Sequence, residues 1–207
     1  MNAHTRQVIL QGPAGTLQCA VDEPAGAPRG LALVCHPHPL HGGTQDNKVV
    51  QTLARAMVQL GWRAVRFNFR GVGASQGAWD EGRGEVDDAL AVLQGFREPG
   101  QPLVLAGFSF GAYVASQVAL RLTGDAAPER TILVGPAVQN FAVAPVPQDS
   151  LVIHGETDEI VSLSSVLDWA RPHSIAITVV PGAGHFFHGQ LPLLKSLVLR
   201  TGWVASA

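Results

Sequence analysis

Continuously apolar segments alternate along the chain with segments in which apolar residues recur every three or four positions. The first kind is typical of strands buried on both faces of a parallel sheet, and the second kind predicts amphipathic helices. The expected strands cover residues 29–37, 62–69, 101–108, 130–135, 150–155 and 174–182. Three of the expected helices cover residues 47–61, 85–97 and 163–171. A fourth begins directly after Ser109, and a fifth begins near His188. This alternation predicts an α/β fold with a doubly wound, mostly parallel sheet and helices on both faces.

The beginning of the chain carries a different pattern. Residues 6–13 and 15–24 each alternate partially between apolar and polar side chains, with turn residues from Pro13 to Gly15 between them. Partial alternation on both sides of a tight turn predicts an antiparallel hairpin at one edge of the sheet. The connection over 135–150 joins two core strands and has room for a loop or a short helix only. We therefore expect no large lid over the edge of the sheet where ligands bind.

Composition limits the number of domains and the kinds of partner. A chain of 207 residues with 46% hydrophobic residues suffices for one substantial core, which predicts a single domain over 1–207. A formal charge of -2 without a block of basic residues argues against a nucleic-acid partner. The oligomeric state stays open, although exposed sheet edges often pair and would then give a homodimer.

The apolar runs and the cysteines bear on where the protein resides. Each apolar run is far shorter than the roughly 20 residues that span a bilayer, so no membrane segment is expected. The first residues lack a basic segment followed by an apolar stretch and a cleavage site, so no secretory signal is readable. Cys19 and Cys35 stand where buried thiols of a reducing compartment are found. We expect a cytoplasmic protein.

A serine between two glycines ends the expected strand over 101–108. In Gly107-Phe108-Ser109-Phe110-Gly111 the serine stands at the junction of strand and helix. A sharp turn there lifts the hydroxyl above the sheet edge and leaves no room for a side chain at either glycine. The free N–H groups of the helix start also favour negative charge. The alternative interpretation is that the serine only caps the helix.

A serine nucleophile needs a base and a third group that orients the base. His185 follows the last expected strand in a glycine-rich loop, and Asp158 follows the strand before it. Because these side chains and the serine all come from the carboxyl ends of strands in one sheet, the sequence predicts that they meet. Glu156 and Glu159 remain alternatives for the carboxylate, and His188 remains one for the base.

The order Ser, Asp, His, with the segments HGETDEIV and GAGH, resembles the α/β-hydrolase superfamily of serine hydrolases over nearly the whole chain. The segments HPHPLHGG, FNFRGVGASQG and AGFSFGA are similar to those of small, lidless bacterial hydrolases related to dienelactone hydrolases and short-chain carboxylesterases. This resemblance implies the α/β-hydrolase fold, with Ser109 as nucleophile, Asp158 as acid and His185 as base. Dienelactone hydrolases proper carry cysteine as nucleophile, so lactone chemistry is not implied here.

An acyl-transfer site also needs two N–H donors that face the carbonyl oxygen. One is expected from the backbone of Phe110. The other is expected from the loop after strand 29–37, where Pro37 and Pro39 have no N–H. His38 and Leu40 remain, and the usual position in the superfamily favours His38, with Leu40 as the alternative. One of the two phenylalanines beside the serine is expected to wall the acyl pocket.

Two further motifs could suggest a bound group. His36, His38 and His41 stand close together, but in a proline-stiffened loop without a carboxylate or thiolate nearby in sequence, so no metal site is expected. The glycines of RGVGASQG do not match a dinucleotide fingerprint, and this segment is expected to form a turn that Arg70 anchors beside the site. We therefore expect no cofactor.

These observations together predict a serine hydrolase that cleaves carboxylic esters of small or short-chain acyl groups through an acyl-enzyme, as a carboxylesterase does. Its partner would be a small-molecule acyl substrate. One alternative is an acyltransferase or a peptidase that uses the same three residues. The other is a binding protein without catalytic activity on the same fold.

Overall fold

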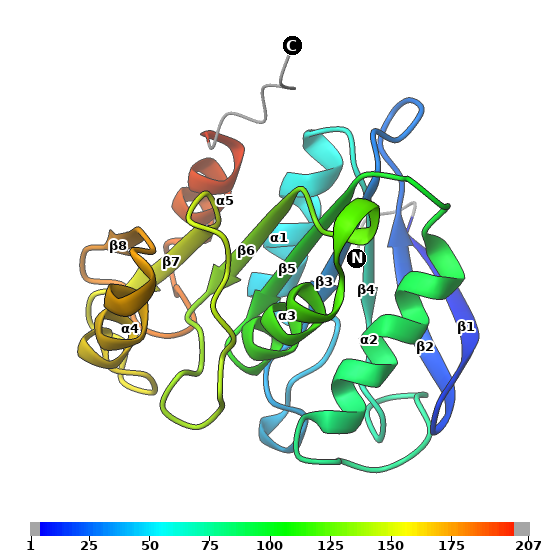
Figure 1. Cartoon of the computed structure of the whole chain (residues 1–207), viewed down its shortest axis with the longest axis horizontal. Helices are drawn as coiled ribbons and strands as arrows, with labels where there is room; N and C mark the ends of the chain where they lie inside the picture. The colour runs from blue at the N-terminus through cyan, green and yellow to red at the C-terminus, as the bar shows by residue number, and fades with distance from the viewer. Residues whose placement is uncertain (1–4, 201–207) are drawn as a thin grey trace.

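One sheet of eight strands runs through the computed structural model, which describes residues 5–200. The strands are β1 (Arg6–Gly12), β2 (Gly15–Asp22), β3 (Leu31–Cys35), β4 (Arg63–Phe67), β5 (Leu103–Phe108), β6 (Arg130–Val134), β7 (Leu151–Gly155) and β8 (Ile177–Val180). They lie in the order β1-β2-β4-β3-β5-β6-β7-β8 (Figure 1). The pairs β1–β2 and β2–β4 are antiparallel, and the other pairs are parallel. The expected hairpin edge and the parallel core are both confirmed.

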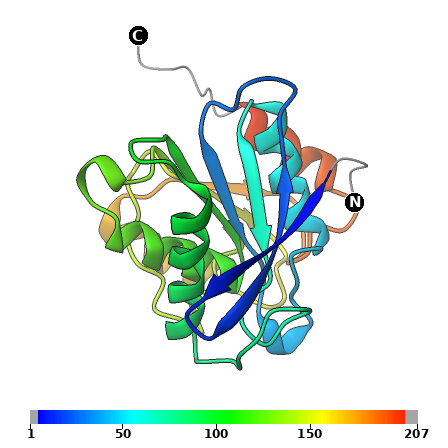
Figure 2. The ribbon, with the colours of Figure 1, turned by 90° about the vertical axis from the view of Figure 1, so that its right-hand side faces the viewer.

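Helices cover both faces of the sheet, as the side view shows (Figure 2). They are α1 (Lys48–Gln59), α2 (Arg83–Phe96), α3 (Phe110–Arg121), α4 (Leu163–Ala170) and α5 (Leu191–Arg200). Side chains of α2, α3 and α4 belong to one buried apolar cluster, and those of α1 and α5 belong to a second. Leu33 of β3 packs in the first cluster and its neighbour Val34 in the second. Because successive strand residues point to opposite faces, burial on both faces explains the continuously apolar runs.

The helix boundaries follow local signals, with one difference from expectation. Asn47 precedes α1, and its Oδ1 accepts the N–H of Val49 at 2.9 Å, which satisfies a free donor of the first turn. The last helix begins at Leu191 rather than near His188. Gly189 has a φ of 73°, a left-handed conformation that a right-handed helix cannot include.

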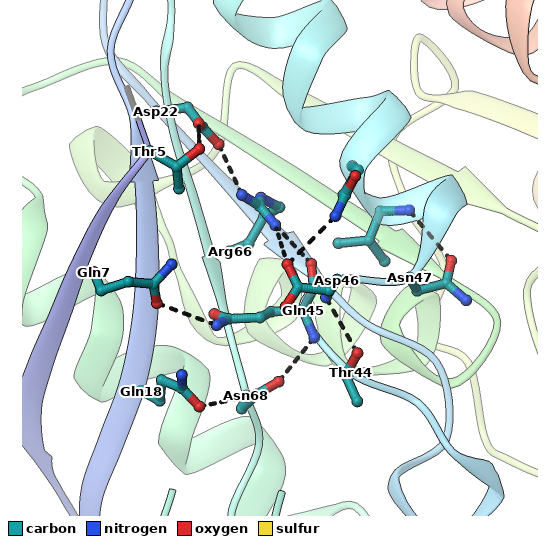
Figure 3. Close-up of polar contacts among 12 residues, drawn as sticks. Thr5, Gln7, Gln18, Asp22, Thr44, Gln45, Asp46, Asn47, Arg66 and Asn68 are labelled. Atoms are coloured by element: carbon teal, nitrogen blue, oxygen red, sulfur yellow. Dashed lines mark hydrogen bonds and ion pairs between the residues drawn. The ribbon is translucent and has the colours of Figure 1, made fainter. Parts of the chain in front are cut away.

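A buried arginine links the antiparallel edge to the parallel core. The Arg66 side chain on β4 is 3% exposed and contacts Asp22 of β2 at 3.0 Å and Asp46, before α1, at 3.2 Å (Figure 3). It also donates to the Gln45 carbonyl at 2.8 Å, and the Gln45 N–H donates to Asn68 Oδ1 at 2.8 Å. We call these five residues the Arg66 network. It holds the segment between β3 and α1 against the sheet.

The connection between β6 and β7 forms a packed loop rather than a lid. It contains neither helix nor strand, and Val143 and Val146 are buried. Gln117 of α3 donates to the Ala142 carbonyl at 2.7 Å, and the Trp169 indole of α4 donates to the Val143 carbonyl at 3.0 Å. The loop therefore lies along α3 and α4, in agreement with the expectation that no large lid is present.

The two cysteines are buried in the core. Cys19 and Cys35 are both free thiols, as the sequence predicted. Burial raises the pKa of both, that of Cys19 to about 12, so they stay protonated and pack as small apolar side chains. Within residues 5–200, no helix has the length and apolar character needed to cross a bilayer.

Candidate active site

The turn between β5 and α3 holds Ser109 in a conformation that few side chains adopt. Its φ is 57° and its ψ is -118°, and such strained residues cluster at functional sites. A Cβ at Gly107 would lie 2.1 Å from the Gly111 carbonyl oxygen, and one at Gly111 would lie 2.2 Å from the Cys35 carbonyl oxygen. Close backbone contact therefore requires both glycines. The serine hydroxyl makes no capping bond to α3, so the helix-cap interpretation is wrong.

Three side chains that follow three different strands form one hydrogen-bonded chain. Ser109 Oγ lies 3.0 Å from His185 Nε2, and His185 Nδ1 lies 2.7 Å from Asp158 Oδ2. The three residues are buried, with Ser109 8% exposed. An ionised carboxylate only accepts hydrogen bonds, so Nδ1 carries the ring proton and Nε2 presents its lone pair to the serine hydroxyl. The imidazole is thus oriented to accept the hydroxyl proton.

Asp158 is held in place by its own loop. Its Oδ1 accepts the N–H groups of Ile160 at 2.9 Å and Val161 at 2.8 Å. Burial by itself raises the pKa of this carboxyl, but the hydrogen bonds from His185, Val161 and Ile160 outweigh burial and leave the pKa below its ordinary value. The carboxylate is therefore ionised at neutral pH and can stabilise a positive charge on the His185 ring.

The loop after β3 determines which backbone N–H groups are available near the serine. The Leu40 N–H donates to His38 Nδ1 at 3.2 Å and is therefore occupied. The N–H groups of His38 and Phe110 donate to no acceptor among residues 5–200. The His38 ring lies 5.3 Å from the Phe110 ring, so this loop lies beside the start of α3.

His36 ties the loop after β3 to the loop after β4. Its Nδ1 donates to the Pro37 carbonyl at 2.6 Å, and its Nε2 accepts the Phe69 N–H at 3.1 Å. Burial lowers the pKa of His36 to about 3, so the ring is neutral and can serve as donor and acceptor at once.

Arg70, which follows Phe69, forms two side-chain hydrogen bonds to Asp88 of α2, at 3.0 and 2.8 Å. It anchors the turn as the sequence predicted.

Comparison with known proteins agrees with this geometry. A family model described as "Serine aminopeptidase, S33" matches residues 28–149. The chain is 40% identical to an α/β serine hydrolase homologue from Coxiella burnetii, covers 97% of each chain and superposes with a TM-score of 0.85. The chain belongs to the family that this model describes, within the α/β-hydrolase superfamily.

Two further relatives of this hydrolase cover most of its length. XC6422 from Xanthomonas campestris, described as a member of the a/b serine hydrolases without lid, is 39% identical, with 97% of this chain and 94% of that chain covered and a TM-score of 0.86. Uncharacterized protein RP471 from Rickettsia prowazekii is 35% identical over 199 residues, which cover 87% of this chain and 82% of the relative. The resemblance to lidless bacterial serine hydrolases is thus confirmed.

The alternative acid and base residues lie elsewhere in the hydrolase. His188 is exposed, and no hydrogen bond joins it to Ser109 in the part of the chain that the structure describes. The carboxylates of Glu156 and Glu159 accept backbone N–H groups of the loop that carries His185, at 2.9 and 3.3 Å. They accept hydrogen bonds from the histidine loop, whereas Asp158 is the one carboxylate in the described part of the chain that contacts the imidazole Nδ1.

Aromatic rings from four segments of the chain gather around Phe110, the residue after the serine. The Phe110 ring lies 5.1 Å from Trp79 and 4.9 Å from Phe141. The His38 ring lies 4.5 Å from Trp79. We call this group the ring cluster, and it consists of His38, His41, Trp79, Phe110, Tyr113 and Phe141. The sequence suggested an aromatic wall at Phe108 or Phe110, but it could not show that Phe141 reaches this place.

A second, smaller aromatic group lies against the imidazole. The His185 ring is 4.9 Å from Phe108 and 5.2 Å from Phe186, whose side chain is 39% exposed. No ring contact joins this group to the ring cluster among residues 5–200. Of the two phenylalanines next to the serine in sequence, Phe108 therefore packs against His185 and Phe110 packs in the ring cluster.

The histidines of the loop after β3 contribute to packing. His38 and His41 stack with their rings 4.4 Å apart, whereas His36 faces the interior. No group of three His, Cys, Asp or Glu side chains within residues 5–200 is arranged to hold a metal ion.

Sequence reasoning missed His154, which stands near the end of β7. Its Nε2 donates to the Val161 carbonyl at 2.9 Å and lies 3.6 Å from Asp158 Oδ2. Burial lowers its pKa, so the ring is neutral. It helps to fix the loop that carries the carboxylate. The available signal was its position directly before Gly155 in the segment VIHGETDEIV.

Proposed function

We propose that this hydrolase cleaves carboxylic esters in two steps that begin at Ser109. The observation that carries the proposal is the pair of hydrogen bonds, 3.0 and 2.7 Å long, that links Ser109 through His185 to Asp158. His185 Nε2 takes the hydroxyl proton as Oγ bonds to the carbonyl carbon, and returns it to the leaving alcohol as the ester C–O bond breaks. The imidazole then deprotonates a water molecule that bonds to the acyl carbon, and returns that proton to Ser109 Oγ as the acyl–Oγ bond breaks and the acid leaves.

The oxygen that becomes negative would be bound by the N–H groups of Phe110 and His38. Both donors are unoccupied among the described residues, whereas the Leu40 N–H is taken by the His38 ring. This favours His38 over Leu40. Donors of this kind typically contribute about 3–4 kcal/mol each to lowering the barrier. The position of the serine at the start of α3 adds a favourable field for the same charge.

A serine aminopeptidase is the second candidate, because the matching family model carries that description. An aminopeptidase cleaves after the first residue of a peptide, so the acyl part of its substrate carries an ammonium group. Such a charge needs a carboxylate partner when water is excluded. We place the acyl side next to the ring cluster around Phe110 and His38. The Glu159 carboxylate, in the loop after β7, accepts the backbone N–H of His185 instead. This arrangement favours an uncharged acyl group.

Covalent labelling separates an enzyme from a binding protein. A fluorophosphonate probe is expected to label the wild-type protein and to leave Ser109→Ala unlabelled. Glu159→Gln is the matched control, because it retains the serine and is expected to label. Absence of labelling in the wild type, or equal labelling of Ser109→Ala, would reject the nucleophile.

Substrate panels separate the remaining reactions. We expect hydrolysis of p-nitrophenyl esters of small acyl groups, with activity lost in Ser109→Ala. Aminoacyl p-nitroanilides test the peptidase, and ester products formed with added alcohols test the acyltransferase. Faster turnover of the anilides than of the esters would overturn the ester proposal in favour of the second candidate.

We also propose that the protein acts on its small-molecule substrate in the cytoplasm. The free and buried state of Cys19 and Cys35 supports a reducing compartment. Fractionation of cells that produce the protein, with the activity on p-nitrophenyl acetate measured in each fraction, tests this location.

A further inference from the structure

The ring cluster borders the place where the acyl part of an ester would lie. His38 and Phe110 supply two of its rings, and their backbone N–H groups are the donors proposed for the carbonyl oxygen. An oxygen held by these two N–H groups brings the attached acyl group within a few bonds of the cluster. The segments that contribute the rings follow β3, β4, β5 and β6, whose connections meet along the lower edge of the molecule in Figure 1.

The leaving alcohol would lie on the opposite side, next to His185. This follows because the imidazole must return its proton to the leaving oxygen. The surroundings there are Phe108 and Phe186, at 4.9 and 5.2 Å from the His185 ring. Since no ring contact joins the two aromatic groups within the described residues, the acyl part and the alcohol part of a substrate meet different side chains.

The ring cluster is preformed by packing within the protein. Phe110 is fully buried and supports Trp79 and Phe141, which are half-buried and keep part of their surface accessible. Phe141 is fixed by its neighbour Ala142, whose carbonyl accepts a hydrogen bond from α3 at 2.7 Å. Burial, and then the neighbouring His41, lower the pKa of His38. The exposed parts of Trp79 and Phe141 are therefore available to an apolar ring.

The mutual orientation of the rings favours an aromatic ligand over an aliphatic one. Trp79 and Phe141 meet nearly edge to face, at 81°, and Phe110 and Phe141 meet at 65°. Rings in such arrangements present both faces and edges, and a further ring gains contacts with them beyond those that its area alone provides. We propose that the substrate of this hydrolase carries an aromatic acyl group, which packs against Trp79, Phe141 and the His38 ring. This inference rests on the proposed ester hydrolysis at Ser109.

Two esters of equal carbon count and the same leaving group test the proposal. We expect kcat/KM for p-nitrophenyl phenylacetate to exceed that for p-nitrophenyl cyclohexylacetate about tenfold, after each is divided by its rate of hydrolysis by hydroxide. Phe141→Leu and Trp79→Leu keep apolar bulk but remove a ring, so each is expected to bring this ratio close to one. The ratio is internal to each variant and does not depend on the fraction of folded protein.

Phe186→Leu is the matched control, because it removes an aromatic ring on the side of the leaving group. It is expected to keep the tenfold ratio. A wild-type ratio of one or less would overturn the aromatic acyl group, and so would a ratio that survives both ring-cluster substitutions or falls only in Phe186→Leu. If the wild type hydrolyses either ester and Ser109→Ala does not, any of these outcomes overturns the aromatic acyl group and leaves the proposed ester hydrolysis intact. No serine-dependent hydrolysis of any ester would overturn the proposed function and this inference together.

Discussion

Two polar networks, each centred on a buried side chain, stand in this molecule, and they differ in what they can do with a proton. In the Arg66 network a guanidinium contacts Asp22 at 3.0 Å and Asp46 at 3.2 Å, between the hairpin edge and the segment before α1 (Figure 3). In the other network, which we call the Ser109 network, the Asp158 carboxylate contacts His185 and the imidazole contacts the serine hydroxyl.

The difference lies in the central side chain. A guanidinium keeps its charge at any pH a protein survives, so it can pair with carboxylates but cannot exchange a proton with them. An imidazole accepts and returns a proton near neutral pH. The Arg66 network therefore serves stability, whereas the Ser109 network is arranged for a reaction. Removing a member of each should affect different measurements.

The largest expected effect is the loss of activity in Ser109→Ala. Removal of the nucleophile should lower kcat on p-nitrophenyl acetate by roughly 100,000-fold or more, because attack on the carbonyl has no substitute. The free energy of unfolding, measured in urea, should change by less than about 1 kcal/mol. If Ser109→Ala kept a tenth of the activity, the Ser109 network would not be the one that carries out the reaction.

Asp158→Asn should follow with a loss of about 10,000-fold in kcat. The amide can donate to His185 Nδ1, which would place the ring proton on Nε2, where it blocks acceptance of the serine proton. Glu159→Gln is the control, since among residues 5–200 the hydrogen bond that this carboxylate accepts comes from the backbone N–H of His185, at 3.3 Å. It should change kcat by less than about tenfold. Equal losses in the two variants would contradict the assignment of the acid.

The part of the fold that the sequence predicted is the part governed by local patterns. A run such as LALVC is apolar because both faces of β3 are covered, so the run itself reports its surroundings. The three residues of the Ser109 network were also predictable, because each follows a strand and parallel strands bring their carboxyl ends to one edge. The start of α5 was misplaced because the conformation of Gly189 is not encoded in apolar spacing.

The Arg66 network and Phe141 could not be predicted, because they depend on register and loop path. Arg66 pairs with Ala20 across β2 and β4, which puts Asp22 two residues along on the same face and within reach of the guanidinium. One residue of slip would turn that carboxylate to the other face. Phe141 reaches the ring cluster through a loop with neither helix nor strand, whose path no periodicity describes.

Arg66→Met should reverse the pattern seen in Ser109→Ala. The substitution leaves Asp22 buried without its guanidinium, which is expected to lower the free energy of unfolding by about 3–5 kcal/mol. Arg63→Met on the same strand is the matched control, because the Arg63–Glu23 pair is 29% and 43% exposed. Such a pair contributes less than about 1 kcal/mol. Equal stability of the two variants in urea would show that the buried network does not stabilise the fold.

Acid should lower the free energy of unfolding, because the buried His36 ring has a lowered pKa. Burial lowers its pKa to about 3 in the folded state, while an unfolded chain has a histidine pKa near ~6.5. Between these values the unfolded state binds a proton that the folded state does not, so stability falls as pH falls, by about 1.4 kcal/mol per pH unit. From pH 7 to pH 5 the contribution is about 2 kcal/mol.

Urea unfolding of the wild type and His36→Asn at several pH values measures this contribution. In the variant, stability should fall less steeply as pH falls, because unfolding takes up about one proton fewer. The part of the pH dependence that comes from the lowered pKa of His154 should remain. An unchanged slope would mean that His36 is accessible to protons in the folded protein.

The smallest expected effect concerns backbone strain, which the Ser109 network contains at its reactive end. Ser109 has a φ of 57°, where a residue with a Cβ is strained and glycine is not. Ser109→Gly should therefore be more stable than Ser109→Ala by about 1 kcal/mol, although both are inactive. At Ser116, inside α3, the same pair of substitutions should give the opposite order, because glycine costs about 1 kcal/mol relative to alanine in a helix. The same order at both positions would mean that the turn at Ser109 stores no strain, and that catalytic geometry there is reached without a cost in stability.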